Sequence, residues 1–229
     1  AEKASSEDVR KEIMVKLGRT YDEELDRPDD AIEAFRQALS IDSRHPAALN
    51  SLEVLYRSKE MWKDLIKVLQ SKIELLEEEA EPEAKIELLM SLGEVYELHL
   101  GEQLAAVKSY QQVIELMDAH MPALRGLERL FMDMEKWQDL LDILEMQYNI
   151  TEIEKEKVDL LTRMAQMLEK EFLKPEEAID KYEQVLLLDP DHEASLDNLQ
   201  RIYRKEKRWD DLVEAYNRHV MVADEDETK

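Results

Sequence analysis

The sequence predicts an all-α fold, a solenoid of about twelve antiparallel helices, and three observations carry this prediction. A unit of more than seventy residues recurs three times along the chain. Apolar residues recur at helical spacing in every copy of this unit. Glycine occurs only 4 times in 229 residues, whereas an average usage of roughly 7% would give about 16. Because sheet-rich folds need glycine for tight turns, the shortage argues against them.

Three tryptophans mark the internal repeat. Trp62 is followed by Trp137 after 75 residues and then by Trp209 after 72, in the contexts KEMWKDL, MEKWQDL and EKRWDDL. The same two offsets relate His45 to His120 and His192, and Phe35 to Tyr110 and Tyr182. We therefore expect a single repeat domain, 1–229, made of three copies at about 7–80, 81–152 and 153–222, with an acidic tail at 223–229.

Each copy divides again into two helix pairs. Leu17 and Leu52 lie 35 residues apart, and so do Leu92 and Leu127; a period in the mid-thirties is typical of helical repeat arrays. The first helices of the six pairs are expected at 7–25, 46–58, 83–100, 121–134, 154–173 and 191–206. The second helices are expected at 28–41, 61–78, 103–117, 136–150, 175–188 and 208–222.

Proline residues stand where several of these helices should begin, because a missing N–H is no loss in the first turn of a helix. They are Pro28, Pro46, Pro82, Pro122 and Pro175, whereas Pro190 follows a helix. Thr151 and Glu154 are spaced as a capping box for the helix at 154–173. These positions set the expected helix boundaries.

The recurrent histidines, His45, His120 and His192, invite interpretation as a metal site. Each occupies the same turn of a successive copy, and helix packing places neighbouring copies roughly 20 Å apart. They cannot share a metal ion at that distance. We interpret them as turn residues near the next helix start.

The first helix pair resembles a tetratricopeptide repeat. Leu17, Gly18, Tyr21, Ala31, Phe35 and Ala38 hold the spacing of that motif, and the resemblance extends over essentially the whole chain. The odd pairs carry about one extra residue in their internal turn. In the even pairs Glu53, Glu128 and Gln200 replace the small residue of the first helix.

The resemblance implies a protein-interaction scaffold that binds a peptide or protein partner in a concave groove lined by the first helices. It implies no enzymatic activity and no cofactor. The alternation of standard and tryptophan-containing pairs is similar to long tandem arrays of bacterial repeat proteins. The alternative interpretation is a structural spacer or a self-assembling segment of a larger repeat protein.

Composition excludes several other classes of function. The chain has 31 Lys+Arg and 55 Asp+Glu, a formal net charge of −24, which argues against nucleic acid and anionic membrane surfaces as partners. Without cysteine it has no disulfide and no thiolate chemistry. No catalytic, cofactor-binding or metal-binding motif is recognisable. Apolar runs are far shorter than the roughly 18 residues of a membrane span, so we expect no membrane insertion and a cytoplasmic location.

The family's groove register, applied to this chain, predicts partner-binding residues on the first helices. They are Arg57, Arg125, Arg129, Arg201 and Arg204, together with Asn50, Met90, Glu94, Met132 and Gln166. Arginine binds carboxylates with two hydrogen bonds and stacks on aromatic rings, so the arginines form a candidate ladder for an extended or helical peptide. In the alternative, the arginines pair with acidic residues on neighbouring first helices and stabilise the stack.

The tryptophans and the ends of the array complete the expectations. We interpret Trp62, Trp137 and Trp209 as core residues because they recur at the start of each even second helix. Terminal repeats need a polar outer face, yet the last helix carries Leu212, Val213, Tyr216 and Val220, and the first carries Val9, Ile13 and Leu17. Either the chain is an excerpt of a longer array, or its ends self-associate.

Overall fold

A computed structural model describes residues 2–76 and 82–226, with side chains described over 6–76 and 82–221. These residues form twelve α-helices and two π-helical segments and contain no strand. The all-α fold class is therefore confirmed. Part of the acidic stretch between the first two copies, and the side chains of the expected acidic tail at 223–229, lie outside the described residues.

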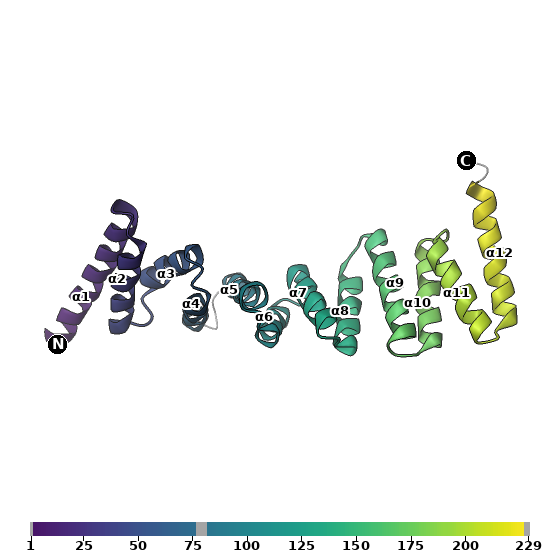
Figure 1. Ribbon diagram of the computed structural model, residues 1–229, viewed down its shortest axis with the longest axis horizontal. Coiled ribbons are helices and arrows are strands. Elements are labelled where there is room, and N and C mark those ends of the chain that lie inside the picture. Colours follow the sequence, from purple (N-terminus) through teal and green to yellow (C-terminus); the bar gives the residue numbers. More distant parts are fainter. Residues whose placement is uncertain (1, 77–81, 227–229) are drawn as a thin grey trace. The chain divides into compact units, whose positions relative to one another are not determined.

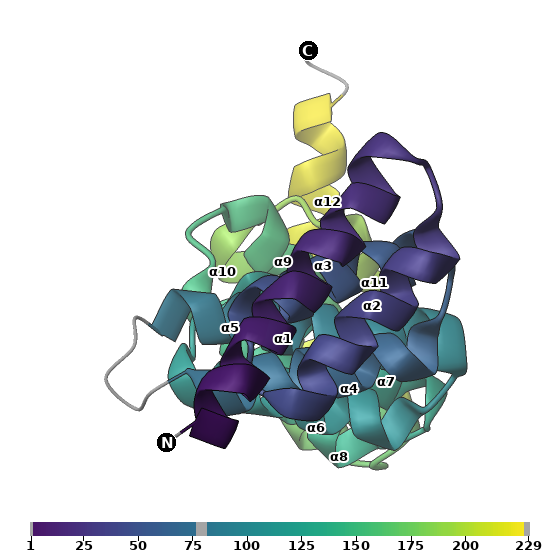
Figure 2. The same ribbon diagram turned by 90° about the vertical axis from the view of Figure 1, so that its left-hand side faces the viewer.

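The chain forms two compact units, residues 1–118 and 119–229. The first holds α1 (Glu2–Arg19), continued by η1 (Thr20–Glu24), then α2 (Pro28–Ile41), α3 (Pro46–Ser58), α4 (Trp62–Leu75), α5 (Pro82–Glu94), continued by η2 (Val95–Leu100), and α6 (Gln103–Leu116). Successive helices pack side by side as pairs, as α1 and α2 show in Figure 1 and Figure 2. Each pair also packs on the next, through α2 with α3 and α4 with α5.

The second unit repeats this arrangement with α7 (Met121–Asp133), α8 (Trp137–Ile150), α9 (Glu154–Lys170), α10 (Pro175–Leu188), α11 (Glu193–Lys205) and α12 (Trp209–Asp226). The pairs are α7 with α8, α9 with α10 and α11 with α12, and they stack through α8 with α9 and α10 with α11. The division between the units falls between the third and the fourth helix pair. The proposed boundaries of the three copies stay a prediction.

Aromatic rings from the second helices fill the space beside a small residue of the first helix. Phe35 is fully buried, and a Cβ atom added to Gly18 would lie 2.7 Å from its ring. Tyr110 packs on Gly93 in the same way, with a corresponding distance of 2.5 Å. Glycine at these two positions therefore permits the close approach of ring and backbone in the first and third pairs.

The recurrent histidines cap helices. The Nδ1 atom of His45 accepts a hydrogen bond from the backbone N–H of Ala48 at 3.3 Å, at the start of α3. His120 and His192 cap α7 and α11 in the same way. The interpretation as turn residues near a helix start is confirmed, and the cap explains why the same residue type recurs, since it satisfies an otherwise unpaired N–H of the first turn.

The proposed capping box is wrong. The N-cap of α9 is Ile153, which has no side-chain cap hydrogen bond. Thr151 instead ends α8, and its hydroxyl donates to the Glu156 carboxylate at 2.7 Å. The threonine therefore orients an acidic side chain rather than the helix start.

In two of the three odd pairs, the first and the third, the extra residue falls where a π-helical segment ends the first helix. The π-helical segments η1 and η2, which continue α1 and α5, take up the insertion by widening the last turn. The turn that follows has a left-handed residue at corresponding positions of each copy, with φ of 49° at Asp26, 66° at Gly101 and 55° at Leu173. The turns of the even pairs do the same at Glu60, Glu135 and Lys207.

The tryptophans are not core residues. Trp62 and Trp137 are half-buried, and Trp209 is 57% exposed. Trp62 stacks on His99 of η2, with ring centroids 3.7 Å apart, so its cover comes from the following helix pair. The tryptophan packs between pairs rather than inside one, and Trp209 is exposed because no following pair covers it within the described residues.

Neither a membrane-crossing helix nor a metal cluster is evident in what the structure describes. None of its helices is long and apolar enough to cross a bilayer. Within the same residues, no group of three or more His, Asp or Glu side chains could hold a metal ion.

Candidate functional site

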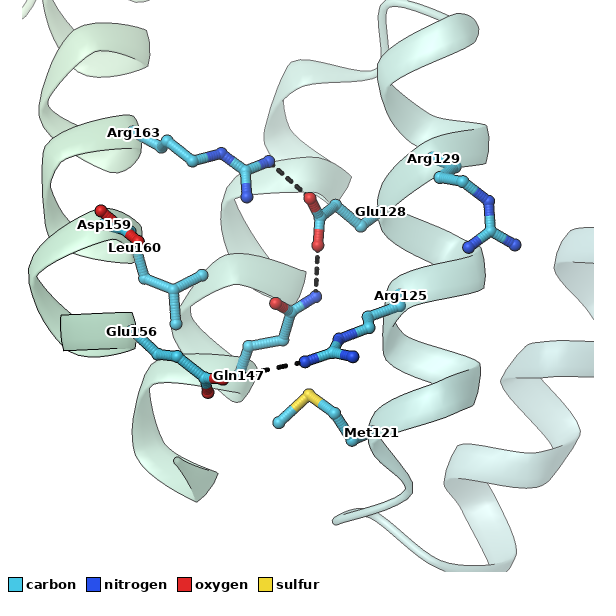
Figure 3. Close-up of a pocket in the computed structure, with 9 residues that line it drawn as sticks. All are labelled: Met121, Arg125, Glu128, Arg129, Gln147, Glu156, Asp159, Leu160 and Arg163. Carbon is cyan, nitrogen blue, oxygen red and sulfur yellow. Dashed lines mark hydrogen bonds and ion pairs between the residues drawn. The ribbon is translucent and has the colours of Figure 1, made fainter. Parts of the chain in front are cut away.

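A hollow of about 350 Å³ lies between α7, α8 and α9 in the second unit (Figure 3). We call it the α7–α9 hollow. Its walls include three arginines, Arg125, Arg129 and Arg163, and three acids, Glu128, Glu156 and Asp159. In a chain with a net charge of −24, a surface whose charges balance is locally far less acidic than the remainder.

The amphipathic pattern of α7 places its charged residues at the hollow. Leu124, Leu127 and Phe131 are buried against the core of the second unit. Arg125 and Glu128, on other sides of the same helix, are turned toward α9, while Arg129 projects away from Glu128 (Figure 3). The spacing that buries the apolar side chains therefore fixes where these charges emerge.

Glu128 is the fixed centre of the hollow. Its side chain is only 16% exposed. Its carboxylate accepts a hydrogen bond from Gln147 Nε2 at 2.7 Å and another from Arg163 Nη2 at 2.5 Å. Gln147 is itself a buried polar residue. Such a network ties three helices together, because each of its groups would be costly to leave unpaired.

The bond between Glu128 and the second helix has a counterpart in every copy. Lys72 donates to Glu53 at 2.5 Å, and Gln200 lies 2.9 Å from His219 Nδ1. All three pairs are 19 residues apart, and they occupy the positions where the even pairs depart from the family motif. The contacts were not predicted from the sequence, although the repeat offsets of 75 and 72 relate both partners of each pair.

The rim of the hollow is loosely held. Arg125 approaches Glu156 at 4.0 Å, and the side chains are 61% and 41% exposed. Glu156 is oriented by the Thr151 hydroxyl. An exposed ion pair at this separation contributes little to stability. Glu156 therefore holds Arg125 in place only weakly.

The family of the chain follows from the sequence matches. Models of the tetratricopeptide repeat match residues 12–45, 48–83 and 195–229. The chain belongs to the tetratricopeptide repeat family. Among the other pairs, the third repeats the ring-on-glycine packing of the first, and the fourth and fifth keep the same order of helices.

Several solved structures are similar to this chain, and one of them has a TM-score above 0.5. The structure described as "Structure of Naa15/Naa10 bound to HypK-THB" has a TM-score of 0.62 at 16% identity, over 91% of this chain and 31% of that one. "Crystal structure of YrrB: a TPR protein with an unusual peptide-binding site" has a TM-score of 0.46 at 17% identity, over 80% of this chain and 89% of that one. "Crystal structure of MamA" has a TM-score of 0.46 at 16% identity, over 76% of this chain and 95% of that one. No curated protein sequence matches this chain significantly.

Besides Arg125, two of the predicted arginines contact neighbouring first helices, and both do so through hydrogen bonds. Arg201 of α11 makes two hydrogen bonds to Glu169 of α9, one of them at 2.7 Å, and a third to Asn198 at 2.8 Å. Arg57 of α3 donates to Ser91 Oγ of α5 at 2.7 Å. The Arg201 contact matches the alternative interpretation, in which arginines pair with acidic residues on neighbouring first helices. Arg57 meets a serine on the neighbouring first helix, and its acidic partner Glu53 lies on its own helix.

The ion pair of Arg201 with Glu169 shifts the pKa of both groups. The hydrogen bond from Arg201 lowers the pKa of Glu169 below its ordinary value of 4.5, although burial opposes this effect. The same hydrogen bond raises the pKa of Arg201. The pair is therefore a structural contact that depends on an ionised Glu169.

Replacing Arg201 with glutamine is expected to lower the free energy of unfolding at neutral pH by about 1–2 kcal/mol, because Glu169 loses its charged hydrogen-bond donor. The folded pKa of Glu169 is depressed, so this stabilisation is present above pH 4.5 and is lost as the pH falls through the lowered pKa. Urea unfolding at several pH values measures the difference between the two proteins. A difference that persists unchanged in strong acid would contradict the assignment.

The other predicted groove residues do not join the α7–α9 hollow. Arg204 donates to the Tyr216 hydroxyl of α12. Met132 is exposed on α7 and Gln166 is half-buried on α9, but neither lines the hollow. In the first unit, Asn50 and Glu94 are exposed and Met90 is half-buried. Of the ten predicted residues, Arg125 and Arg129 are the two that the hollow contains.

Proposed function

We propose that the chain is a protein-interaction scaffold that binds an acidic peptide segment of a partner protein in the α7–α9 hollow. Tetratricopeptide repeats generally serve as non-enzymatic scaffolds, and a structural neighbour is described as having a peptide-binding site. Of the five arginines predicted to form a ladder, Arg125 and Arg129 line this hollow. Arg57 and Arg201 join successive helix pairs, and Arg204 bonds the second helix of its own pair.

One observation carries the proposal: Arg125 is exposed and weakly paired above a rigid floor. The floor is the hydrogen-bonded network of Glu128, Gln147 and Arg163. A preorganised site loses little conformational entropy when a ligand binds. A carboxylate that replaced Glu156 at Arg125 would gain a charge-assisted bond, and with favourable geometry two parallel ones.

Apolar and acidic side chains beside the arginines set further requirements on the peptide. Met121 and Leu160 line the hollow, so an apolar side chain next to the acidic one fits. Asp159 and Glu156 repel a second carboxylate at their end of the hollow. We therefore expect peptides with one or two acidic residues beside an apolar residue rather than long acidic runs.

A second function, that of a structural spacer, is favoured by the paired arginines. The bonds from Arg57 to Ser91 and from Arg201 to Glu169 join successive pairs. A pure spacer would use Arg125 in the same way. Its separation of 4.0 Å from Glu156 is the feature that distinguishes it.

Selection of a random peptide display library on the 229-residue chain tests the binding function. We expect enriched peptides to contain Asp or Glu, and Arg125→Glu to weaken their binding at least tenfold, since a charged hydrogen bond contributes about 1.5–3 kcal/mol. Fluorescence anisotropy with the selected peptides gives the dissociation constants.

The matched control is Arg44→Glu, which makes the same charge change at an exposed arginine outside the hollow. It should leave the affinity nearly unchanged. Arg125→Lys should weaken binding less than Arg125→Glu, because it keeps the charge but loses the planar fork. Equal losses in Arg44→Glu and Arg125→Glu, or no enriched peptide at all, would exclude the hollow as the binding site.

A further inference from the structure

Two apolar helix faces are uncovered within their own units. On α12, Val213, Tyr216 and Val220 are exposed, and their spacing of three and four places them on one side of the helix. On α1, Ile13 and Leu17 are exposed one turn apart. We call these sets the α12 face and the α1 face. Leu212, expected with the first set, is instead buried in the core of the second unit.

The internal repeat identifies what covers the counterparts of the α12 face. A shift of 72 residues leads from Val213, Tyr216 and Val220 to Leu141, Leu144 and Tyr148 on α8, and a further shift of 75 leads to Ile66, Leu69 and Ile73 on α4. α4 packs on α5 and α8 packs on α9. Ile66, which α5 covers, is therefore only 8% exposed, whereas its counterpart Val213 is 59% exposed.

The α1 face is the other half of the same contact. Ile13 and Leu17 correspond to Leu88 and Leu92 on α5, and to Leu160 and Met164 on α9. Leu88 and Leu92 pack in one cluster with Ile66 and Leu69 of α4. Leu160 is 7% exposed, whereas Ile13 is 52% exposed. The first helix of a copy therefore carries the surface that the last helix of the preceding copy covers.

We propose that the chain associates with itself head to tail, with the α12 face of one molecule on the α1 face of the next. The contact repeats the packing of α4 on α5 and of α8 on α9, so the same residue positions meet in the same order. A second copy of the chain is the partner that fits. Its α1 carries the apolar residues Ile13 and Leu17 at the two positions that are covered by the preceding copy in α5 and α9.

The exposed Trp209 supports the same arrangement. Its counterpart Trp62 is covered by His99, which follows α5 in the next pair. An incoming α1 with its η1 segment would cover Trp209 in the corresponding place. Because the two faces differ, each bound molecule keeps one face free to bind a further molecule.

Sedimentation velocity of the 229-residue chain over a concentration series tests the proposal. We expect the mean mass to rise with concentration. Val213→Glu, which blocks the α12 face, and Ile13→Glu, which blocks the α1 face, should each be monomeric. An equimolar mixture of the two variants should form a dimer of twice the monomer mass and nothing larger, because one intact face of each kind remains.

The mixture also shows that both variants are folded, since an unfolded variant could not restore association. Leu104→Glu is the control, an equally exposed apolar residue on α6 away from both faces, and it should associate as the wild type does. A wild-type chain that is monomeric at every concentration would overturn the proposal and assign the two faces to other occupants. Self-association of Ile13→Glu alone would overturn it too, because it would mean that like faces pair.

Discussion

Replacing Phe35 with alanine is expected to lower the free energy of unfolding by about 3–5 kcal/mol, the usual cost of removing a buried aromatic ring. The side chain is fully buried in the cluster formed by the first unit, between α1 and α3. Its ring lies against the backbone at Gly18, so the neighbouring helices cannot collapse into the space without moving apart elsewhere. Urea unfolding followed by circular dichroism measures the loss.

A double-mutant cycle separates the ring contact from the general loss of apolar area. Gly18→Ala alone is expected to cost about 1–3 kcal/mol, because its new Cβ atom would lie 2.7 Å from the ring. In a Phe35→Leu background the same change should cost clearly less. If Gly18→Ala costs the same in both backgrounds, the close approach of ring and glycine does not hold the pair together.

Replacing Glu128 with alanine is expected to lower the free energy of unfolding by about 2–4 kcal/mol. The change leaves the buried Gln147 amide without its acceptor and removes the partner of Arg163. It also removes the floor of the α7–α9 hollow, so binding of the selected peptides should weaken although Glu128 itself contacts no ligand. Chemical unfolding and anisotropy measure the two effects on the same preparation.

The control for Glu128 is the double variant Glu128→Leu/Gln147→Leu. Replacing both partners of a buried polar pair by apolar groups is often nearly neutral, so this variant should recover much of the stability lost in Glu128→Ala. It should not recover peptide binding, because Arg163 still lacks its acceptor. Full recovery of binding would mean that the network plays no part in shaping the hollow.

The fold could be predicted from the sequence because it rests on local periodicity. Positions such as Phe35, Tyr110 and Tyr182 recur at fixed offsets and are all buried, and a helix pair is defined almost entirely by such contacts within itself and with its neighbours. Several helix starts could be predicted from proline, which is favoured in the first turn of a helix. The capping box at Thr151 failed because the N-cap of α9 is Ile153, so Thr151 lies two residues before the cap position and its hydroxyl donates to Glu156 instead.

The candidate site was only partly predictable. The family's register indicates which residues leave the core, and two of the residues that it selects, Arg125 and Arg129, line the hollow. It cannot tell which arginine is paired, because that depends on the neighbouring helix. Arg201 makes two hydrogen bonds to the Glu169 carboxylate, whereas the nearest nitrogen of Arg125 lies 4.0 Å from the Glu156 carboxylate. The prediction that the tryptophans are core residues failed for a related reason. A residue that recurs at one position of the repeat can pack between helix pairs as well as inside one.

The most direct test of the central claim, that the α7–α9 hollow binds acidic peptide, is a nuclear magnetic resonance titration of the isotope-labelled chain with the tightest selected peptide. We predict that amide shifts change in Met121–Asp133 and in the first half of Glu154–Lys170, and that these changes vanish in Arg125→Glu but remain in Arg44→Glu. Shift changes confined to the second helices, or unchanged in Arg125→Glu, would contradict the account.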